Sequence, residues 1–196
     1  VINFEFKIVN TILFVKSLDV ETKRHAAGAV WSLAVNNQDN KNAIRNADAI
    51  PHLVVLLELD DVETQRHAAG ALRVLASNNK DNQDAIRDAD AIPQLVTLLK
   101  SPDVETKQYA AGAIWNLAQN NKDNQDAIRV EGAIPQLVVV LEEDDVITKR
   151  HAASALRILA HHNKDNQHAI RKSGAIPHFV ALLQLTDFEI KMLTLN

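Results

Sequence analysis

The stretch HAAGALRVLASNNKDNQDAIRDADAIPQLVTLL occupies residues 67–99, and a close copy, YAAGAIWNLAQNNKDNQDAIRVEGAIPQLVVVL, occupies residues 109–141. The same step of 42 residues separates the four prolines that follow an Ala-Ile pair, which are Pro51, Pro93, Pro135 and Pro177. Repeats of this length are typical of solenoids, in which each unit buries its apolar face only against its neighbours. The period therefore predicts a solenoid whose function lies on a surface and not in an enclosed pocket.

Each unit is predicted to contain three helices, which makes the fold class all-α. The Asn-rich runs at 78–82 and 120–124 supply side chains that can cap a short first helix. The Ala-Ile-Pro segment suits the start of a second helix, because the missing N–H of proline costs little in a first turn. A third helix of about 17 residues is expected after each of five aspartates, Asp19, Asp61, Asp103, Asp145 and Asp187.

The chain is predicted to form one continuous array over residues 1–196. The first unit is degenerate, because Val9 stands where the proline is expected, and the last unit stops soon after its third helix begins. The expected units are a partial one at 1–38, complete ones at 39–80, 81–122 and 123–164, and a partial one at 165–196.

The composition indicates a helical protein of a reducing compartment. Apolar residues make up 46% of the chain and charged residues 23%, and the absence of cysteine excludes disulfides and thiolate catalysis. The apolar N-terminal stretch is interrupted by Glu5, Lys7 and Asn10, so we expect neither a signal peptide nor a membrane span there. The expected location is the cytoplasm, the nucleus or both.

The quoted strings resemble the armadillo repeat family, and the resemblance extends over nearly the whole chain. It implies a right-handed α-solenoid of about four to five 42-residue repeats with three helices each. It also implies that the third helices line a concave groove, and that this groove holds an extended peptide of a partner protein. The expected function is that of a protein-protein interaction scaffold that is not an enzyme.

One face of each third helix is predicted to be free. At 100° per residue, the small and aliphatic residues of the first third helix share its buried side, which holds Ala26, Ala27, Ala29, Val30, Leu33 and Ala34. The opposite faces of the four helices supply the candidate partner-binding residues. These are Arg24, His25, Trp31, Ser32, Arg66, His67, Arg73, Gln108, Tyr109, Trp115, Asn116, Gln119, Arg150, His151 and Arg157.

The free faces are more basic than the rest of the chain. They carry five arginines and three glutamates, a formal charge of +2, in a chain whose net charge is −4. Arginine suits bidentate contacts with carboxylates, and aromatic residues supply rigid contact area, so we predict an extended, acidic peptide ligand. Two alternatives remain open: the arginines are ordinary solvated residues, and Trp31 and Trp115 pack at unit junctions instead of lying exposed.

Two subfamilies can be compared with this pattern. Importin-alpha-like receptors carry a tryptophan and, four residues later, an asparagine on the third helix. The tryptophan position here holds Gly28, Gly70, Gly112 and Ser154, and only Asn116 matches the asparagine. Because a basic groove also repels a basic import signal, that function is disfavoured. Beta-catenin and its relatives look more similar. The close likeness of the units indicates recent duplication or consensus design.

Other classes of function have less support. The densest histidine cluster, His161, His162 and His168, matches no zinc-motif spacing, so we expect no metal and no cofactor. A pI near 6.1 disfavours nucleic-acid binding, although the arginines could contact a short single strand. Self-association through the apolar ends, Val1 to Phe14 and Phe188 to Leu195, stays open.

Overall fold

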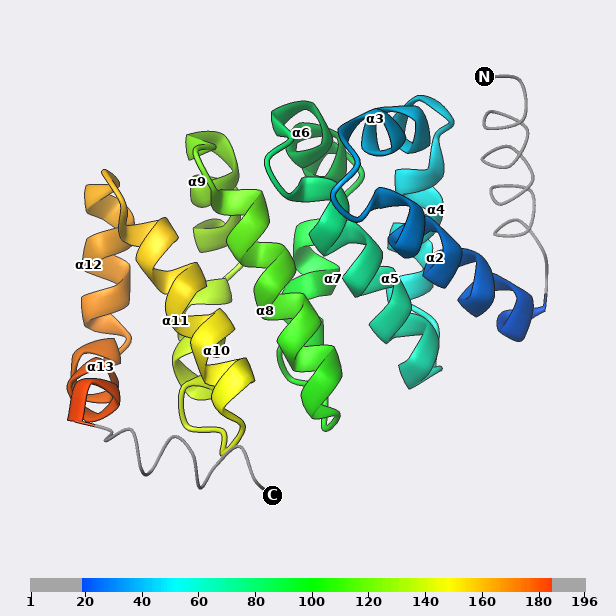
Figure 1. Cartoon of the computed structure of the whole chain (residues 1–196). Coiled ribbons are helices and arrows are strands. Elements are labelled where there is room, and N and C mark those ends of the chain that lie inside the picture. Colours follow the sequence, from blue (N-terminus) through cyan, green and yellow to red (C-terminus); the bar gives the residue numbers. More distant parts are fainter. Residues whose placement is uncertain (1–18, 185–196) are drawn as a thin grey trace.

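The computed structural model describes residues 19–184, and this range consists of helices joined by short turns (Figure 1). The first helices of the units are α3 (Gln38–Asn46), α6 (Lys80–Asp88), α9 (Lys122–Val130) and α12 (Lys164–Lys172). The second helices are α4 (Ala49–Leu57), α7 (Ala91–Leu98), α10 (Ala133–Val140) and α13 (Ala175–Gln184). The third helices are α2 (Val20–Ala34), α5 (Val62–Ala76), α8 (Val104–Ala118) and α11 (Val146–Ala160). The predicted all-α solenoid is confirmed.

Aspartate caps start the third helices as predicted. In α5 the Asp61 carboxylate accepts hydrogen bonds from the N–H of Thr64 at 2.8 Å and from its hydroxyl at 2.5 Å. These two bonds lower the pKa of Asp61. The same cap begins the other third helices at Asp19, Asp103 and Asp145. Each third helix contains 15 residues, slightly fewer than expected, and the cap predicted at Asp187 lies outside the described residues.

The Asn-Asn pairs build the turns before the first helices. Asn78 adopts a left-handed conformation with φ of 53°, and Asn79 then caps α6 by accepting the N–H of Asn82. Short polar side chains tolerate this backbone region better than most residues. The turns before the second helices use the same region, at Asp48, Asp90, Gly132 and Gly174, as their residue types indicated.

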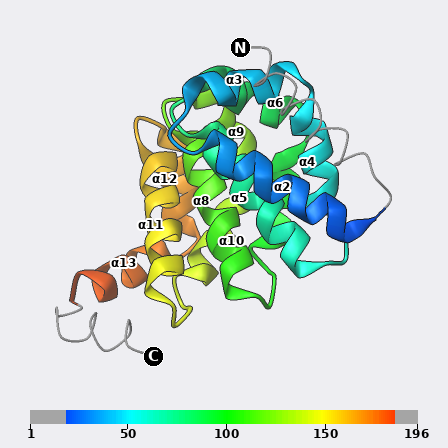
Figure 2. The same ribbon diagram turned by 45° about the vertical axis from the view of Figure 1, so that its right-hand side comes forward.

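The third helices lie side by side in chain order, and the second helices lie behind them (Figures 1 and 2). Between neighbouring third helices the small residues Ala71, Ala113 and Ala155 are fully buried, which lets the backbones approach closely. The expectation that Ala29 is buried was wrong. Ala29 is exposed because α2 is the first third helix in the described range, so that among the third helices it packs on α5 alone.

A ladder of buried amides ties each unit to the next. Asn124 of α9, which is fully buried, donates to the carbonyls of Leu117 in α8 and Gln83 in α6, both of which belong to the preceding unit. Gln83 in turn donates to the carbonyls of Asn116 and Gln119 at the end of α8. Because these bonds satisfy carbonyls that helix ends leave free, they fix the angle between units.

The first rung of this ladder is different. Lys41 stands where the later units have glutamine, and its ammonium group donates to the Ser77 carbonyl at 2.6 Å. Burial lowers the pKa of Lys41, and the carboxyl end of α5 is a favourable place for a cation.

The predicted domain boundaries stay a prediction, because the described helices continue from unit to unit without a break in packing. The apolar ends considered for self-association, Val1 to Phe14 and Phe188 to Leu195, lie outside the described residues. Within residues 19–184, every helix is too short or too polar to cross a bilayer.

Candidate functional site

The candidate residues gather on the surface formed by α2, α5, α8 and α11, which we call the third-helix face. All of them are exposed or half-buried except Asn116. Asn116 is only 9% exposed, and its side-chain amide donates to the Arg73 carbonyl at 2.8 Å. The expectation that Asn116 is available to a partner was therefore wrong, because its amide links α8 to α5.

Trp31 packs at a unit junction, as the second of the two alternatives proposed. A Cβ atom at Gly70 would lie 2.7 Å from the indole, so the ring rests on the α5 backbone at this glycine. Beyond Gly70 the indole meets Tyr109 of α8 edge to face, with ring centroids 4.9 Å apart. Trp31 thus reaches across a whole unit while staying half-buried on the third-helix face.

Arg73 repeats this arrangement one unit later. A Cβ atom at Gly112 would lie 2.7 Å from Cδ of Arg73 and 3.7 Å from Cδ2 of His151. The guanidinium lies over the Tyr109 ring, 5.4 Å from its centroid, which is a cation–π contact. The glycine therefore lets side chains from α5 and α11 meet above α8.

Trp115 extends this row of packed side chains toward α11. Its ring centroid lies 6.2 Å from that of His151, and the indole is half-buried. Three nitrogen atoms in this cluster have almost no contact with solvent and no hydrogen-bond partner: Nε of Arg73, Nε1 of Trp115 and Nδ1 of His151. By contrast, Nδ1 of the equivalent His67 lies 2.7 Å from the Glu63 carbonyl. The cluster between α5 and α11 therefore has unused hydrogen-bonding capacity.

Two of the five arginines are already neutralised. Arg24 forms an ion pair with Glu63 of the next unit at 2.5 Å. Arg66 does the same with Glu105 at 2.9 Å and with Asp103 at 3.0 Å. The expectation that all five arginines are available to a ligand was therefore wrong for Arg24 and Arg66. Sequence reasoning missed these contacts. A signal was present, because the next pair of equivalent positions holds Gln108 and Ile147, so the arginine and its glutamate partner are replaced together.

The other three of these five arginines form no ion pair with residues 19–184. Arg150 and Arg157 are exposed on α11, and Arg73 is half-buried on α5. Burial, together with the nearby charges of Arg73 and Arg150, lowers the pKa of His151 to about 4. Positive charge on the third-helix face is thus concentrated toward α11.

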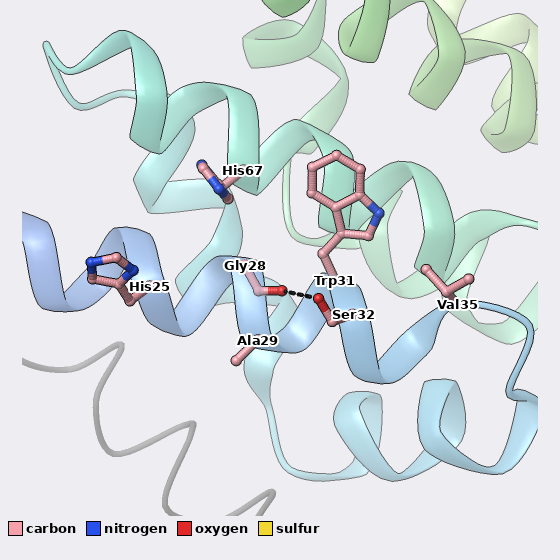
Figure 3. Close-up of a pocket in the computed structure, with 7 residues that line it drawn as sticks. All are labelled: His25, Gly28, Ala29, Trp31, Ser32, Val35 and His67. Carbon is pink, nitrogen blue, oxygen red and sulfur yellow. Dashed lines mark hydrogen bonds between the residues drawn. The ribbon is translucent and has the colours of Figure 1, made fainter.

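The end of the face near α2 has a different character. His25, Gly28, Ala29, Trp31, Ser32, Val35 and His67 line a shallow pocket of about 460 Å³ there (Figure 3). The Ser32 hydroxyl donates to the Gly28 carbonyl at 2.9 Å. A Cβ atom at Gly28 would meet the His67 ring, whereas Gly70 and Gly112 are covered by Trp31 and Arg73.

The other histidines form no metal centre in the described part of the chain. Across residues 19–184, no group of three His, Cys, Asp or Glu side chains is placed to hold an ion. The rings of His161 and His162 meet edge to face at 4.0 Å, and Nδ1 of His168 faces Arg171 at 3.3 Å.

Stacked three-helix units with an open face of arginine and aromatic side chains define an α-solenoid scaffold for protein interactions. The model of the Armadillo/beta-catenin-like repeat matches residues 37–77, 79–119 and 121–161. The chain therefore belongs to the armadillo/beta-catenin-like repeat family. No curated protein matches the sequence significantly.

Solved structures of engineered proteins are similar to the whole described array. One engineered protein is 32% identical, with a TM-score of 0.89 over 95% of this chain and 76% of its own. A second is 30% identical, with a TM-score of 0.88 over 95% of this chain and 77% of its own. A designed armadillo repeat protein in complex with the peptide (KR)4 shares the fold at 23% identity, with a TM-score of 0.86 over 95% and 78%.

Proposed function

We propose that the third-helix face binds an extended, acidic peptide segment of a partner protein, without catalysis. The observation that carries this proposal is that Arg73, Arg150 and Arg157 have no ion pair in the described range. The Tyr109 ring lies against the Arg73 guanidinium, and the Trp115 ring lies beside that of His151. Guanidinium groups bind carboxylates bidentately, and half-buried Tyr and Trp side chains supply the rigid contacts of binding hot spots. We further propose that the scaffold works in the cytoplasm or the nucleus.

The charge distribution also gives the peptide a register. Acidic side chains would lie over α5, α8 and α11, where the arginines are unpaired. A flat, uncharged side chain would occupy the pocket at Gly28, beside Trp31 and His67. The Arg24 and Arg66 ion pairs join α2 to α5 and α5 to α8, and they hold the helices together instead of attracting the ligand.

Two peptides of opposite charge test the preference. The designed protein in complex with (KR)4 holds a basic peptide, so (KR)4 and an acidic counterpart, (DE)4, form a matched pair of probes. We expect fluorescence anisotropy to show binding of (DE)4 that weakens as salt rises, because rim charges act through a screened field. Equal or tighter binding of (KR)4 would contradict the acidic preference.

Two charge-matched variants locate the binding surface. Arg157→Gln removes an unpaired arginine and Arg66→Gln removes a paired one, so both change the net charge equally. We expect Arg157→Gln to weaken (DE)4 binding by about 5- to 10-fold, on the order of 1 kcal/mol, and Arg66→Gln to weaken it by less than about twofold. Equal losses would mean that the long-range field alone attracts the peptide. Circular dichroism of both variants serves as the folding control.

A further inference from the structure

We propose that Arg73, Trp115 and His151 form an anion subsite above Gly112, and that this subsite takes up a proton when an acidic side chain of the peptide occupies it. The inference rests on the proposed function and adds a chemical property that ordinary charge attraction lacks. The ligand group is a carboxylate or another acidic side chain.

The geometry brings these groups together from three helices. Gly112 leaves a notch on α8 in which Arg73 of α5 and His151 of α11 both lie, within 2.7 Å and 3.7 Å of the position that a Cβ atom would take. Trp115, one turn further along α8, stands beside the His151 ring. All three side chains carry a buried nitrogen without a hydrogen-bond partner.

Buried polar nitrogens without partners are costly. Nε of Arg73 and Nε1 of Trp115 are donors, and Nδ1 of His151 becomes one when the ring is protonated, so an anion placed between them removes the cost. Because the three nitrogens have almost no contact with solvent, a ligand reaches them only when a side chain shifts. Arg73 is the flexible member, since its guanidinium forms no ion pair within the described range and rests on the Tyr109 ring. A carboxylate would draw the guanidinium off this ring and expose the imidazole.

The surroundings of His151 explain why the free protein does not hold a proton on this ring. Burial is the largest cause of the lowered pKa of His151, and Arg73 from α5 and Arg150 from its own helix lower the pKa further. Asp145 at the start of α11 acts in the opposite sense. The groups facing it from α8 are the uncharged Trp115 and Gly112, and no charged group of α10 or α12 is among those that act on it. The ring is therefore neutral at physiological pH in the free protein.

An anion in the notch reverses this balance. A negative charge between Arg73 and His151 offsets the guanidinium and favours the imidazolium, so the pKa of His151 rises on binding from about 4 toward its ordinary value. Between pH 6.5 and 4 the complex then holds more protons than the free protein. By linkage, affinity must rise as pH falls through this window.

A sulfonate peptide isolates the protein's own titration. We would use a peptide that alternates cysteic acid and serine, because its side chains stay ionised throughout the window. Calorimetry at pH 5.5 in two buffers of different ionisation enthalpy counts the protons taken up. We expect nearly one proton per peptide, and affinity about tenfold higher at pH 5.5 than at pH 7.5 if binding restores a pKa near 6.5.

Matched histidine variants complete the test. His151→Gln should abolish both the proton uptake and the pH dependence, whereas His168→Gln, an exposed histidine of α12 outside the third-helix face, should preserve both. An NMR titration of the His151 ring in the unmodified protein, with and without peptide, measures the same shift without a substitution. Binding that is independent of pH would overturn this inference alone, and absence of binding at every pH would overturn the proposed function as well.

Discussion

Gly70 and Gly112 each stand in the middle of a helix, where glycine costs about 1 kcal/mol relative to alanine. Both are needed because a side chain of the preceding unit crosses the backbone at that point. The crossing side chains differ, however. Trp31 is a rigid ring held against Tyr109, while Arg73 is a flexible chain that can turn away.

The same substitution should therefore have opposite effects at the two sites. We expect Gly70→Ala to lower the free energy of unfolding by about 1–3 kcal/mol, because the Trp31 ring has to leave its packed position. Gly112→Ala should leave the free energy of unfolding unchanged or raise it by up to about 1 kcal/mol, because Arg73 moves and helix propensity improves. Urea denaturation followed by circular dichroism measures both, and similar losses at the two sites would contradict this difference in rigidity.

His151 should also make folding stability depend on pH. Its pKa is lowered to about 4 in the folded protein, whereas the unfolded chain titrates near 6.5. Between these values the unfolded state binds more protons, so the free energy of unfolding falls as pH drops from 6.5 to 4. We expect His151→Gln to reduce the loss between pH 7 and pH 5 by about 1 kcal/mol, a value that allows for screening of the partly exposed ring.

Comparing urea midpoints of this variant and of His67→Gln at the two pH values checks the expectation. Lower pH therefore has opposite effects on the two free energies: it destabilises the free fold and strengthens peptide binding. A stability loss that is the same in His151→Gln and in the unmodified protein would assign it to other groups.

At the scale of the helices, the amide ladder joins one unit to the next. Asn124 donates to two carbonyls and accepts a hydrogen bond from Arg87 at 3.0 Å. Asn166 makes the same two donations, but its carbonyl oxygen has no partner, and the neighbouring Arg129 Nε is also left unsatisfied. The two asparagines differ by one charged hydrogen bond.

Asn124→Ala should therefore cost more than Asn166→Ala. We expect about 2–4 kcal/mol for Asn124, because its removal takes a donor from two buried carbonyls and an acceptor from the Arg87 guanidinium, which keeps Asp84 and Asp88. The cost for Asn166 should be about 1 kcal/mol less. Chemical denaturation of the two variants gives the comparison directly. Equal costs would show that the Arg87 bond contributes nothing.

The sequence predicted those features of the helices that depend on neighbouring residues. Aspartate caps such as Asp61 and left-handed positions such as Asp90 need only residues within one turn, so a local pattern suffices. The partners of Arg66 and Asn116 could not be predicted in this way. They belong to the adjacent unit, and which side chains meet there depends on how closely the alanine-lined helices approach each other.

At the scale of the whole molecule, paired and unpaired arginines occupy different parts of the third-helix face. Ion pairs between units occupy the third-helix face near α2 and α5, and unpaired arginines occupy it toward α11. Helical periodicity predicted the face correctly in outline, because each free stripe lies on the same side of its helix. It did not predict the division of the face, since this arises from contacts between residues 37–39 positions apart.

The crossing position alternates between tryptophan and arginine along the array, at Trp31, Arg73, Trp115 and Arg157. Trp31 passes over Gly70 to Tyr109, and Arg73 passes over Gly112 to His151, so each contact spans three consecutive third helices. A single 42-residue segment moved elsewhere would bring a crossing residue without the partner on which it ends. The smallest cassette that could be copied or inserted while keeping its own contacts is therefore a pair of units, and arrays engineered from this chain should be lengthened two units at a time.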